Sequence, residues 1–557
     1  MKIRVRIKVD KTISITFPII TLAIFCFLSR LLSEPLILYL GIPFSLTTFF
    51  FLNLLHVSEK RICLNTSAST IKLLLCPLTI LSILTVLLVP PLEGVPAEWM
   101  SVLLPNWIRC LSSIVLTSFI PGYFLLQIID RGKSIKGIAT IVISYLLSLF
   151  ITSIVGFLIL LTGNSISSVA LQTILAINLL LMLVYFVVNI TSINFLESLL
   201  LLFVLLTVTI SSLFVMLYTF PINRSDMPYH LGLALKYSKS FPVYGGFLIP
   251  AYPYFFHLYL GALFSLSGIM PAVVEQSLYI LNFMPVLAFY SAVEEWFNEK
   301  KDKRIALIAT SLSILLGFGG LYMLYLRCVQ PAFSITQLLS IATYKTYDIY
   351  MRILLLPDIV APIWNIGLPV LLMLLYFLRK DTYSYTKKAI VPILIALGWL
   401  GHIAEPIIFI FILLVYTLFF RQSRGGGFGP HVMLGLFLVA IVDLIAPAQI
   451  YLRSVKEEFS TPFFTSLSLS MLITVIEVIE DKLMVNFSTN IKNFTLKRLE
   501  TVWRFGRWIL LYAYIFPFIV WLAVEKNFNL WEWGGYSSVP FFVFPLRFGA
   551  VGLLAVT

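Results

Sequence analysis

An acid and an imidazole lie four residues apart in the longest polar interruption of the first half of the chain. They are Asp226 and His230, in the segment Asp226-Met-Pro-Tyr-His230. If a helix begins at Asp226, positions i and i+4 share one face, so the two side chains are neighbours. Such a carboxylate can accept a proton from a hydroxyl group or hold a divalent cation beside a phosphate. The alternative is that Asp226 only caps the helix and His230 is an interfacial side chain.

A second imidazole–carboxylate pair, His402 and Glu405, lies in the short turn between two apolar runs. Ionisable residues at membrane depth are costly and are usually functional or paired. We therefore expect the pair to join Asp226 in a shared cavity, where it would orient a substrate. The alternative is a buried, hydrogen-bonded pair that joins two helices.

These side chains together have the composition of a metal site. Carboxylates and imidazoles suit Zn²⁺ or Mn²⁺, and carboxylates suit Mg²⁺. Asp226, His257 and His402 are the candidate ligands. A divalent ion (Mn²⁺, Mg²⁺ or Zn²⁺) is thus the candidate cofactor, while the five scattered cysteines predict neither a zinc cluster nor a disulfide framework.

The elements that position these residues are predicted to be membrane helices. The chain is 60% hydrophobic and 12% charged, whereas soluble domains carry about 25% charged residues. Its net charge of +13 does not indicate nucleic-acid binding, because the Lys and Arg residues lie between apolar runs and form no basic patch. Apolar runs of about 20 residues instead predict spanning helices surrounded by lipid.

The sequence predicts an all-α polytopic membrane protein with about 16 spans. The lower bound is about 14, because three of the runs are short for a full crossing. The predicted spans are 13–32, 35–55, 72–92, 108–129, 138–162, 169–188, 196–218, 271–297, 305–326, 359–378, 389–401, 406–420, 431–450, 467–481, 508–524 and 541–557.

One apolar stretch, 253–268, is predicted to be a juxtamembrane helix against the outer leaflet. At about 24 Å, its sixteen residues are too short for the hydrocarbon core. If this stretch does not cross the membrane, most Lys and Arg residues of the loops fall on the side that holds the N-terminus. The positive-inside rule assigns that side to the cytoplasm. Asp226 then lies on the outer face. The basic segment 482–507 is predicted to be an amphipathic helix on the inner leaflet.

The outer stretch combines D-x-P-x-H, from Asp226 to His230, with Y-P-x-x-x-H, from Tyr252 to His257. This combination resembles the first outer loop of the GT-C superfamily, which comprises membrane glycosyltransferases that use polyprenyl-phosphate sugars. The resemblance covers about residues 196–420 and implies a GT-C-like core with outer-face juxtamembrane helices. It implies that Asp226 is the catalytic base or metal-side acid, with His230 and His257 beside it, and that Tyr252 contacts substrate.

The resemblance also divides the chain into three regions. Residues 1–195 form an N-terminal helical extension, because Asp226 follows the seventh predicted span whereas the family's acid follows the first. Residues 196–420 form the core, with outer loops 219–270 and 327–358. Residues 421–557 form the C-terminal helices.

The second outer loop supplies the remaining site residues that the resemblance implies. The candidates for a second outer acid are Asp348 and Asp358. Arg327 and Arg352 are candidates for the donor phosphate, which Arg binds through forked hydrogen bonds. Alternatively, these arginines anchor the loop to lipid headgroups.

The expected activity is sugar transfer from a polyprenyl-phosphate donor to a lipid, glycan or protein acceptor on the outer face. The expected location is a prokaryotic plasma membrane or an endoplasmic-reticulum-type membrane, and the expected partners are membrane lipids and the lipid-linked sugar.

A transporter or lipid flippase is the first alternative, for which Asp443, deep in an apolar run, would be a pore residue rather than a packing residue. A non-catalytic scaffold subunit is the second. Glu477, near a predicted inner helix end, is expected to be solvated.

Overall fold

The computed structural model describes residues 68–91, 104–130, 134–135, 137–185, 227–239, 254–269, 283–296, 364–379, 385–419, 427–445 and 460–483, and the single positions 19, 23, 278, 281, 306 and 310. The regular structure in these ranges is α-helical and they contain no β-strand. The prediction of an all-α fold is confirmed.

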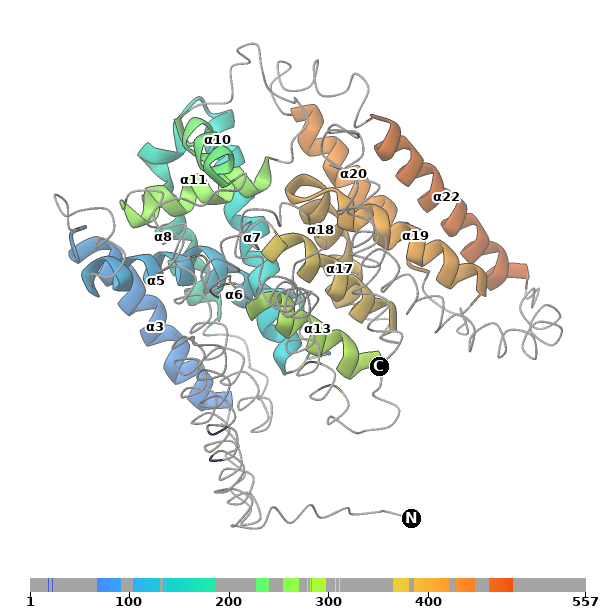
Figure 1. The fold of residues 1–557 in the computed structure, drawn as a ribbon, viewed down its shortest axis with the longest axis horizontal. Helices are drawn as coiled ribbons and strands as arrows, with labels where there is room; N and C mark the ends of the chain where they lie inside the picture. Colours follow the sequence, from blue (N-terminus) through green and yellow to red (C-terminus); the bar gives the residue numbers. More distant parts are fainter. Residues whose placement is uncertain are drawn as a thin grey trace.

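The helices of the described ranges follow one another along the chain and are labelled in Figure 1. They are α3 (Ala68–Leu88), α5 (Leu104–Ser118), α6 (Ile120–Ile129), α7 (Ile138–Leu161), α8 (Ile166–Tyr185), α10 (Met227–Lys239), α11 (Phe255–Ser267), α13 (Phe283–Trp296), α17 (Trp364–Arg379), α18 (Tyr385–Gly401), α19 (Ala404–Phe419), α20 (Gly429–Ile445) and α22 (Ser460–Leu483).

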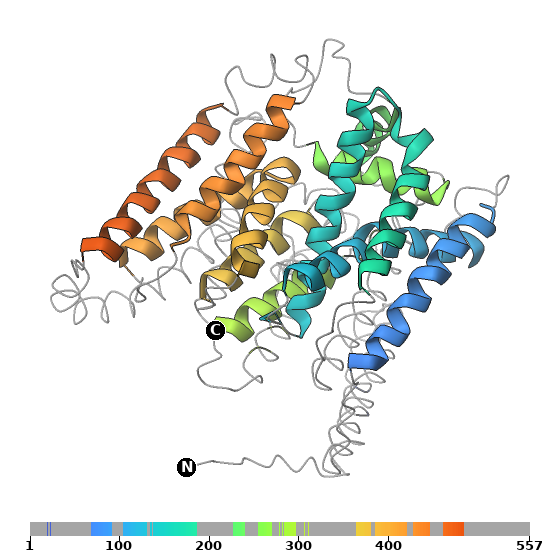
Figure 2. The same cartoon turned by 180° about the vertical axis from the view of Figure 1, so that it is seen from behind.

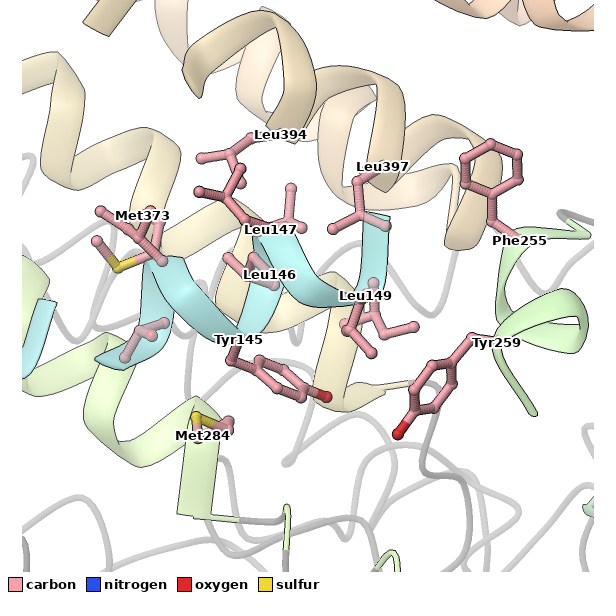
Figure 3. Close-up of a cluster of buried hydrophobic side chains, with 14 of the residues drawn as sticks. Tyr145, Leu146, Leu147, Leu149, Phe255, Tyr259, Met284, Met373, Leu394 and Leu397 are labelled. Atoms are coloured by element: carbon pink, nitrogen blue, oxygen red, sulfur yellow. The ribbon is translucent and has the colours of Figure 1, made fainter. Parts of the chain in front are cut away.

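Helix α7 is at the centre of the bundle. Its 24 residues are almost entirely apolar, and it contacts α5, α6, α8 and α11 on one side and α13, α17 and α18 on the other. Figure 3 shows its buried side chains, among them Leu146 and Leu147, between Leu394 of α18 and Met284 of α13. The same core includes Val432 of α20 and Ile473 of α22, so helices from all three predicted regions belong to one packed core.

A row of hydroxyl side chains on α7 sets its close contact with α6. Ser144 and Ser148 lie one turn apart, and the Ser148 hydroxyl accepts a hydrogen bond from the Gly122 N–H at 2.7 Å. A side chain at Gly122 would collide with the α7 backbone at Ser144. Small residues allow helix backbones to approach closely, which is how helices associate where lipid removes the hydrophobic drive.

Helix α11 is short and lies inside the bundle. It has 13 residues, all of them buried except Ser265, and its C-cap Gly268 is left-handed with φ 63°. The predicted helix at 253–268 is confirmed, but its surroundings differ from the prediction. Helices α5, α7, α8 and α10 cover it, so it does not lie bare against the lipid.

The two flanks of the bundle expose large apolar side chains. Helix α3 lies at one edge and α22 at the opposite edge, as both views show (Figures 1 and 2). On α3, Leu81 is 62% and Leu88 is 73% exposed, and on α22 Phe464 is 60% exposed. Exposed apolar patches of this kind indicate contact with a membrane or another protein.

Two of the described helical segments are long and apolar enough to cross a membrane, Pro105–Ile129 and Ile138–Leu161. The first comprises α5 and α6. Three helices are longer than the short predicted spans 389–401, 406–420 and 467–481: they are α18, α19 and α22, of 17, 16 and 24 residues. Polar residues at their ends, such as Lys387 of α18 and Ser460 of α22, concealed their true length.

Candidate functional site: two buried histidine pairs

Helix α10 spans Met227–Lys239, directly after the predicted cap residue Asp226, which lies outside the described residues. It packs against α11. The contact is close at Gly261, where an added side chain would meet the Ala234 carbonyl oxygen at 3.3 Å and Ser238 Cβ at 3.3 Å. Residues 227–239 and 254–269 therefore fold together as a helical pair.

His230 of α10 and His257 of α11 form a hydrogen-bonded pair at this contact. His230 Nδ1 lies 2.9 Å from His257 Nε2, and the rings stack with centroids 5.2 Å apart and planes at 22°. Both residues are fully buried. One ring must donate and the other accept, so the bond fixes a tautomer of each imidazole and can pass a proton between them.

Aromatic rings surround the pair on both helices. The Tyr237 ring stacks on His257 with centroids 5.6 Å apart, and Phe256 meets His230 edge-on at 5.8 Å. Such contacts orient an imidazole and exclude water from it. The alternative that His230 is an interfacial side chain is wrong, because none of its surface is exposed.

Both ends of α11 are attached to neighbouring helices by polar contacts. At the N-terminal end, the Tyr254 hydroxyl donates a hydrogen bond to Asp443 Oδ1 of α20 at 3.1 Å. At the C-terminal end, the Arg109 guanidinium donates to the carbonyl oxygens of Ser267, Val86 and Val89. Arg109 thus binds the ends of α3 and α11 together, since the last carbonyls of a helix lack partners within it.

The middle of α11 is fixed by hydroxyl groups. The Tyr259 hydroxyl and the Ser118 hydroxyl of α5 are hydrogen-bonded at 2.7 Å, and Ser153 of α7 donates to the Phe255 carbonyl oxygen at 2.9 Å. Burial raises the pKa of Tyr259 to about 12. The phenol therefore stays protonated at neutral pH, and the contact does not depend on pH in that range.

The second pair, His402 and Glu405, lies where α18 ends at Gly401 and α19 begins at Ala404. His402 Nδ1 and Glu405 Oε2 form a short hydrogen bond. Glu405 is fully buried and His402 is 16% exposed. Gly367 of α17 makes room for the carboxylate, because an added Cβ there would lie 2.6 Å from Glu405 Cδ.

The structure brings four of the predicted site residues together as two pairs, the first on α10 and α11 and the second on α18 and α19. The other six predicted residues lie outside the described residues, namely Asp226, Tyr252, Arg327, Asp348, Arg352 and Asp358.

Of the three predicted metal ligands, His257 and His402 are described and Asp226 is not. Two imidazole ligands of one tetrahedral zinc ion lie about 3.3 Å apart, given bonds of about 2.0 Å, whereas His230 and His257 bond directly at 2.9 Å. Within the described ranges, no group of three or more His, Cys, Asp or Glu side chains could hold a metal. A metal site that uses Asp226 remains a prediction.

Three charged residues were not predicted to take part in the structure around these pairs. They are Arg109 and Glu477, which are buried, and Asp443, which is partly buried. Glu477 is 3% exposed rather than solvated. Its carboxylate accepts the Phe428 and Gly429 N–H groups, both at 2.9 Å, at the start of α20. A charge within an apolar run was the signal that could have identified them.

Comparison with known proteins gives no relative: no protein-family model, curated protein or solved structure matches the chain.

Proposed function

We propose that this protein is a multi-pass membrane glycosyltransferase of the GT-C kind, which transfers a sugar from a polyprenyl-phosphate donor on the outer face of its membrane. The observation that carries the proposal is the α10–α11 pair directly after Asp226. The hydrogen bond between His230 and His257 fixes α10 against α11. A carboxylate at the start of α10 would therefore be attached to a rigid support, as precise catalysis requires.

In the proposed reaction, the hydroxyl oxygen of the acceptor attacks the anomeric carbon of the donor sugar. The bond from that carbon to the phosphate oxygen breaks, and the polyprenyl phosphate leaves with the electron pair. Asp226 takes the proton of the acceptor hydroxyl, and its charge also favours the positive charge that develops on the sugar. Arg327 or Arg352 is proposed to bind the donor phosphate, and Tyr252 is proposed to contact substrate.

The proposed topology, with the N-terminus in the cytoplasm, is supported by contacts between segments predicted on the same side. Tyr254 in the proposed outer loop meets Asp443 near the proposed outer end of α20. On the proposed cytoplasmic side, Asp130 at the end of α6 accepts hydrogen bonds from Ser134 and from Thr386 at the start of α18, at 2.7 and 2.8 Å. The apolar flanks on α3 and α22 support a lipid environment.

A lipid flippase or transporter is the rival activity, and the place of Asp443 argues against it. A transported group is expected to meet polar residues near the bilayer midplane. Asp443 instead accepts a hydrogen bond from Tyr254, the N-cap residue of α11, at 3.1 Å. Its carboxylate is therefore already paired within the protein.

The test is transfer by the purified full chain in proteoliposomes, with radiolabelled sugars on short polyprenyl phosphates and a panel of acceptor lipids. We expect Asp226→Asn to reduce transfer at least about 100-fold, the lower range for a lost general base. Ser225→Ala is the matched control and should transfer normally. Full transfer by a folded Asp226→Asn protein would contradict the proposal, as would lipid flipping without transfer, which indicates the rival activity.

A further inference from the structure

Asp443 lies in a helix that otherwise contains almost no ionisable group. The sequence of α20 is GPHVMLGLFLVAIVDLI, and the two residues after Asp443, Leu444 and Ile445, are 72% and 53% exposed. An aspartate among such residues is costly in a bilayer unless it has a partner. The Tyr254 hydroxyl is such a partner at 3.1 Å.

Tyr254 transmits this contact to the first turn of α11. Its side chain is 7% exposed, and its ring stacks on Phe157 of α7 with centroids 6.2 Å apart and planes at 28°. Its own carbonyl accepts the Leu258 N–H at 3.0 Å, the first hydrogen bond of the helix. The ring, the backbone and the hydroxyl of Tyr254 are therefore fixed by three different elements.

His257 is three residues beyond Tyr254, in the same turn. Its bond to His230 has the usual length of 2.9 Å, and donor–acceptor distances of protein hydrogen bonds extend to about 3.2 Å. A shift of the first turn of α11 by a few tenths of an ångström is enough to weaken the pair. The position of Tyr254 thus controls the geometry of the two imidazoles.

We infer that Asp443 is a positioning residue: by accepting the Tyr254 hydrogen bond, it fixes the first turn of α11 and so sets His257 against His230. Through this contact, the C-terminal helices influence the proposed site without touching substrate. The effect on sugar transfer rests on the proposed function, whereas the effect on the histidine pair does not.

The first measurement is the reactivity of the two histidines in the full chain in nanodiscs. Diethyl pyrocarbonate labels accessible imidazoles, and mass spectrometry gives the rate at His257. We expect Tyr254→Phe and Asp443→Leu each to raise that rate about fivefold, as for loss of one ordinary hydrogen bond. Asp443→Asn, which keeps an acceptor oxygen, should change the rate less than about twofold.

The control and the double variant make the test specific. Leu444→Ala removes an exposed neighbour on the same helix and should leave labelling at His257 unaltered. Tyr254→Phe combined with Asp443→Leu should label no faster than either alone, because both remove the same bond. If Asp443→Leu fails to fold, Tyr254→Phe, which lacks only the hydroxyl, decides the test.

Two results would overturn the inference. Unchanged labelling in Tyr254→Phe would mean that the contact does not position α11. Equal effects of Asp443→Asn and Asp443→Leu would mean that the charge matters, as the rival transport activity requires.

Transfer kinetics give a separate readout. We expect Tyr254→Phe to lower kcat with little change in KM for the donor. If the wild-type chain transfers no sugar, the proposed function fails, yet the labelling rates still decide whether Asp443 positions His257.

Discussion

At the scale of single residues, the His230–His257 pair and the His402–Glu405 pair show how polar side chains in this protein gain hydrogen-bond partners. His230 and His257 bond to each other across two helices, and His402 bonds to Glu405 within one turn. Burial of a polar group without a partner costs about 1–3 kcal/mol in proteins. Each pair avoids part of this cost and at the same time fixes the orientation of the imidazoles involved.

Gly367 tests the packing of the second pair. We expect Gly367→Ala to lower the free energy of unfolding by about 1–3 kcal/mol, the usual cost of an overpacked core. The reason is that the new methyl group would lie 2.6 Å from Glu405 Cδ. Thermal unfolding in detergent measures the change.

Gly232 of α10 is the matched control, because an added side chain there meets nothing within 4 Å. Gly232→Ala should leave stability unchanged or raise it by up to about 1 kcal/mol. Equal melting temperatures for the two alanine variants would show that Glu405 does not occupy the space beside Gly367.

At the scale of elements, α11 is a short helix with polar contacts at its ends and middle. Tyr254 contacts α20, Tyr259 contacts α5, and the Ser267 carbonyl contacts Arg109. A 13-residue helix has little stability alone, so these contacts and its burial determine its position. The helix that carries His257 is thus placed by tertiary contacts more than by its own sequence.

Arg109 makes more of these contacts than the other residues, because one guanidinium donates to carbonyls on two helices. Arg109→Met keeps the apolar stem and leaves those carbonyls without a donor, so we expect a loss of about 2–3 kcal/mol of unfolding free energy. Arg109→Lys should be intermediate, because an ammonium group lacks the planar fork. Chemical denaturation in micelles measures both.

Ile108→Ala, at a residue 40% exposed on the same helix, is the control and should cost less than either substitution. A Met variant as stable as the wild type would mean that Arg109 does not join α3 to α11.

At the scale of the whole molecule, the apolar flanks and the contacts between distant segments define the proposed orientation. Pro90, just beyond α3, is exposed and lies on the proposed outer side, whereas Lys388 in α18 is exposed on the proposed inner side. Both positions lie at the ends of helices, and they are on different sides of the membrane in the proposed topology.

Cysteine labelling tests this orientation. In a background without the native cysteines, we expect Pro90→Cys in intact cells to react with a membrane-impermeant maleimide. Lys388→Cys should react only after permeabilisation, because the positive-inside rule retains its segment in the cytoplasm. Inverted vesicles should give the opposite pattern. Labelling of both sites from the same side would refute the proposed topology.

The sequence by itself determined the fold class, because composition and apolar runs restrict the backbone to helices in lipid. It also identified the short length of α11, because local signals for helix ends are read along the chain. The polar turn at His402 and Glu405 was equally visible. All these features depend on residues that are neighbours in sequence.

Only the tertiary structure decided which polar groups meet. Tyr254 and Asp443 are 189 residues apart, Arg109 and Ser267 are 158 apart, and Asp130 and Thr386 are 256 apart. No local pattern encodes such contacts, since they depend on how the helices pack around α7. The same packing buries α11, His230 and Glu477, for which the sequence allowed positions at a surface. A single sequence does not reveal which neighbours cover a helix.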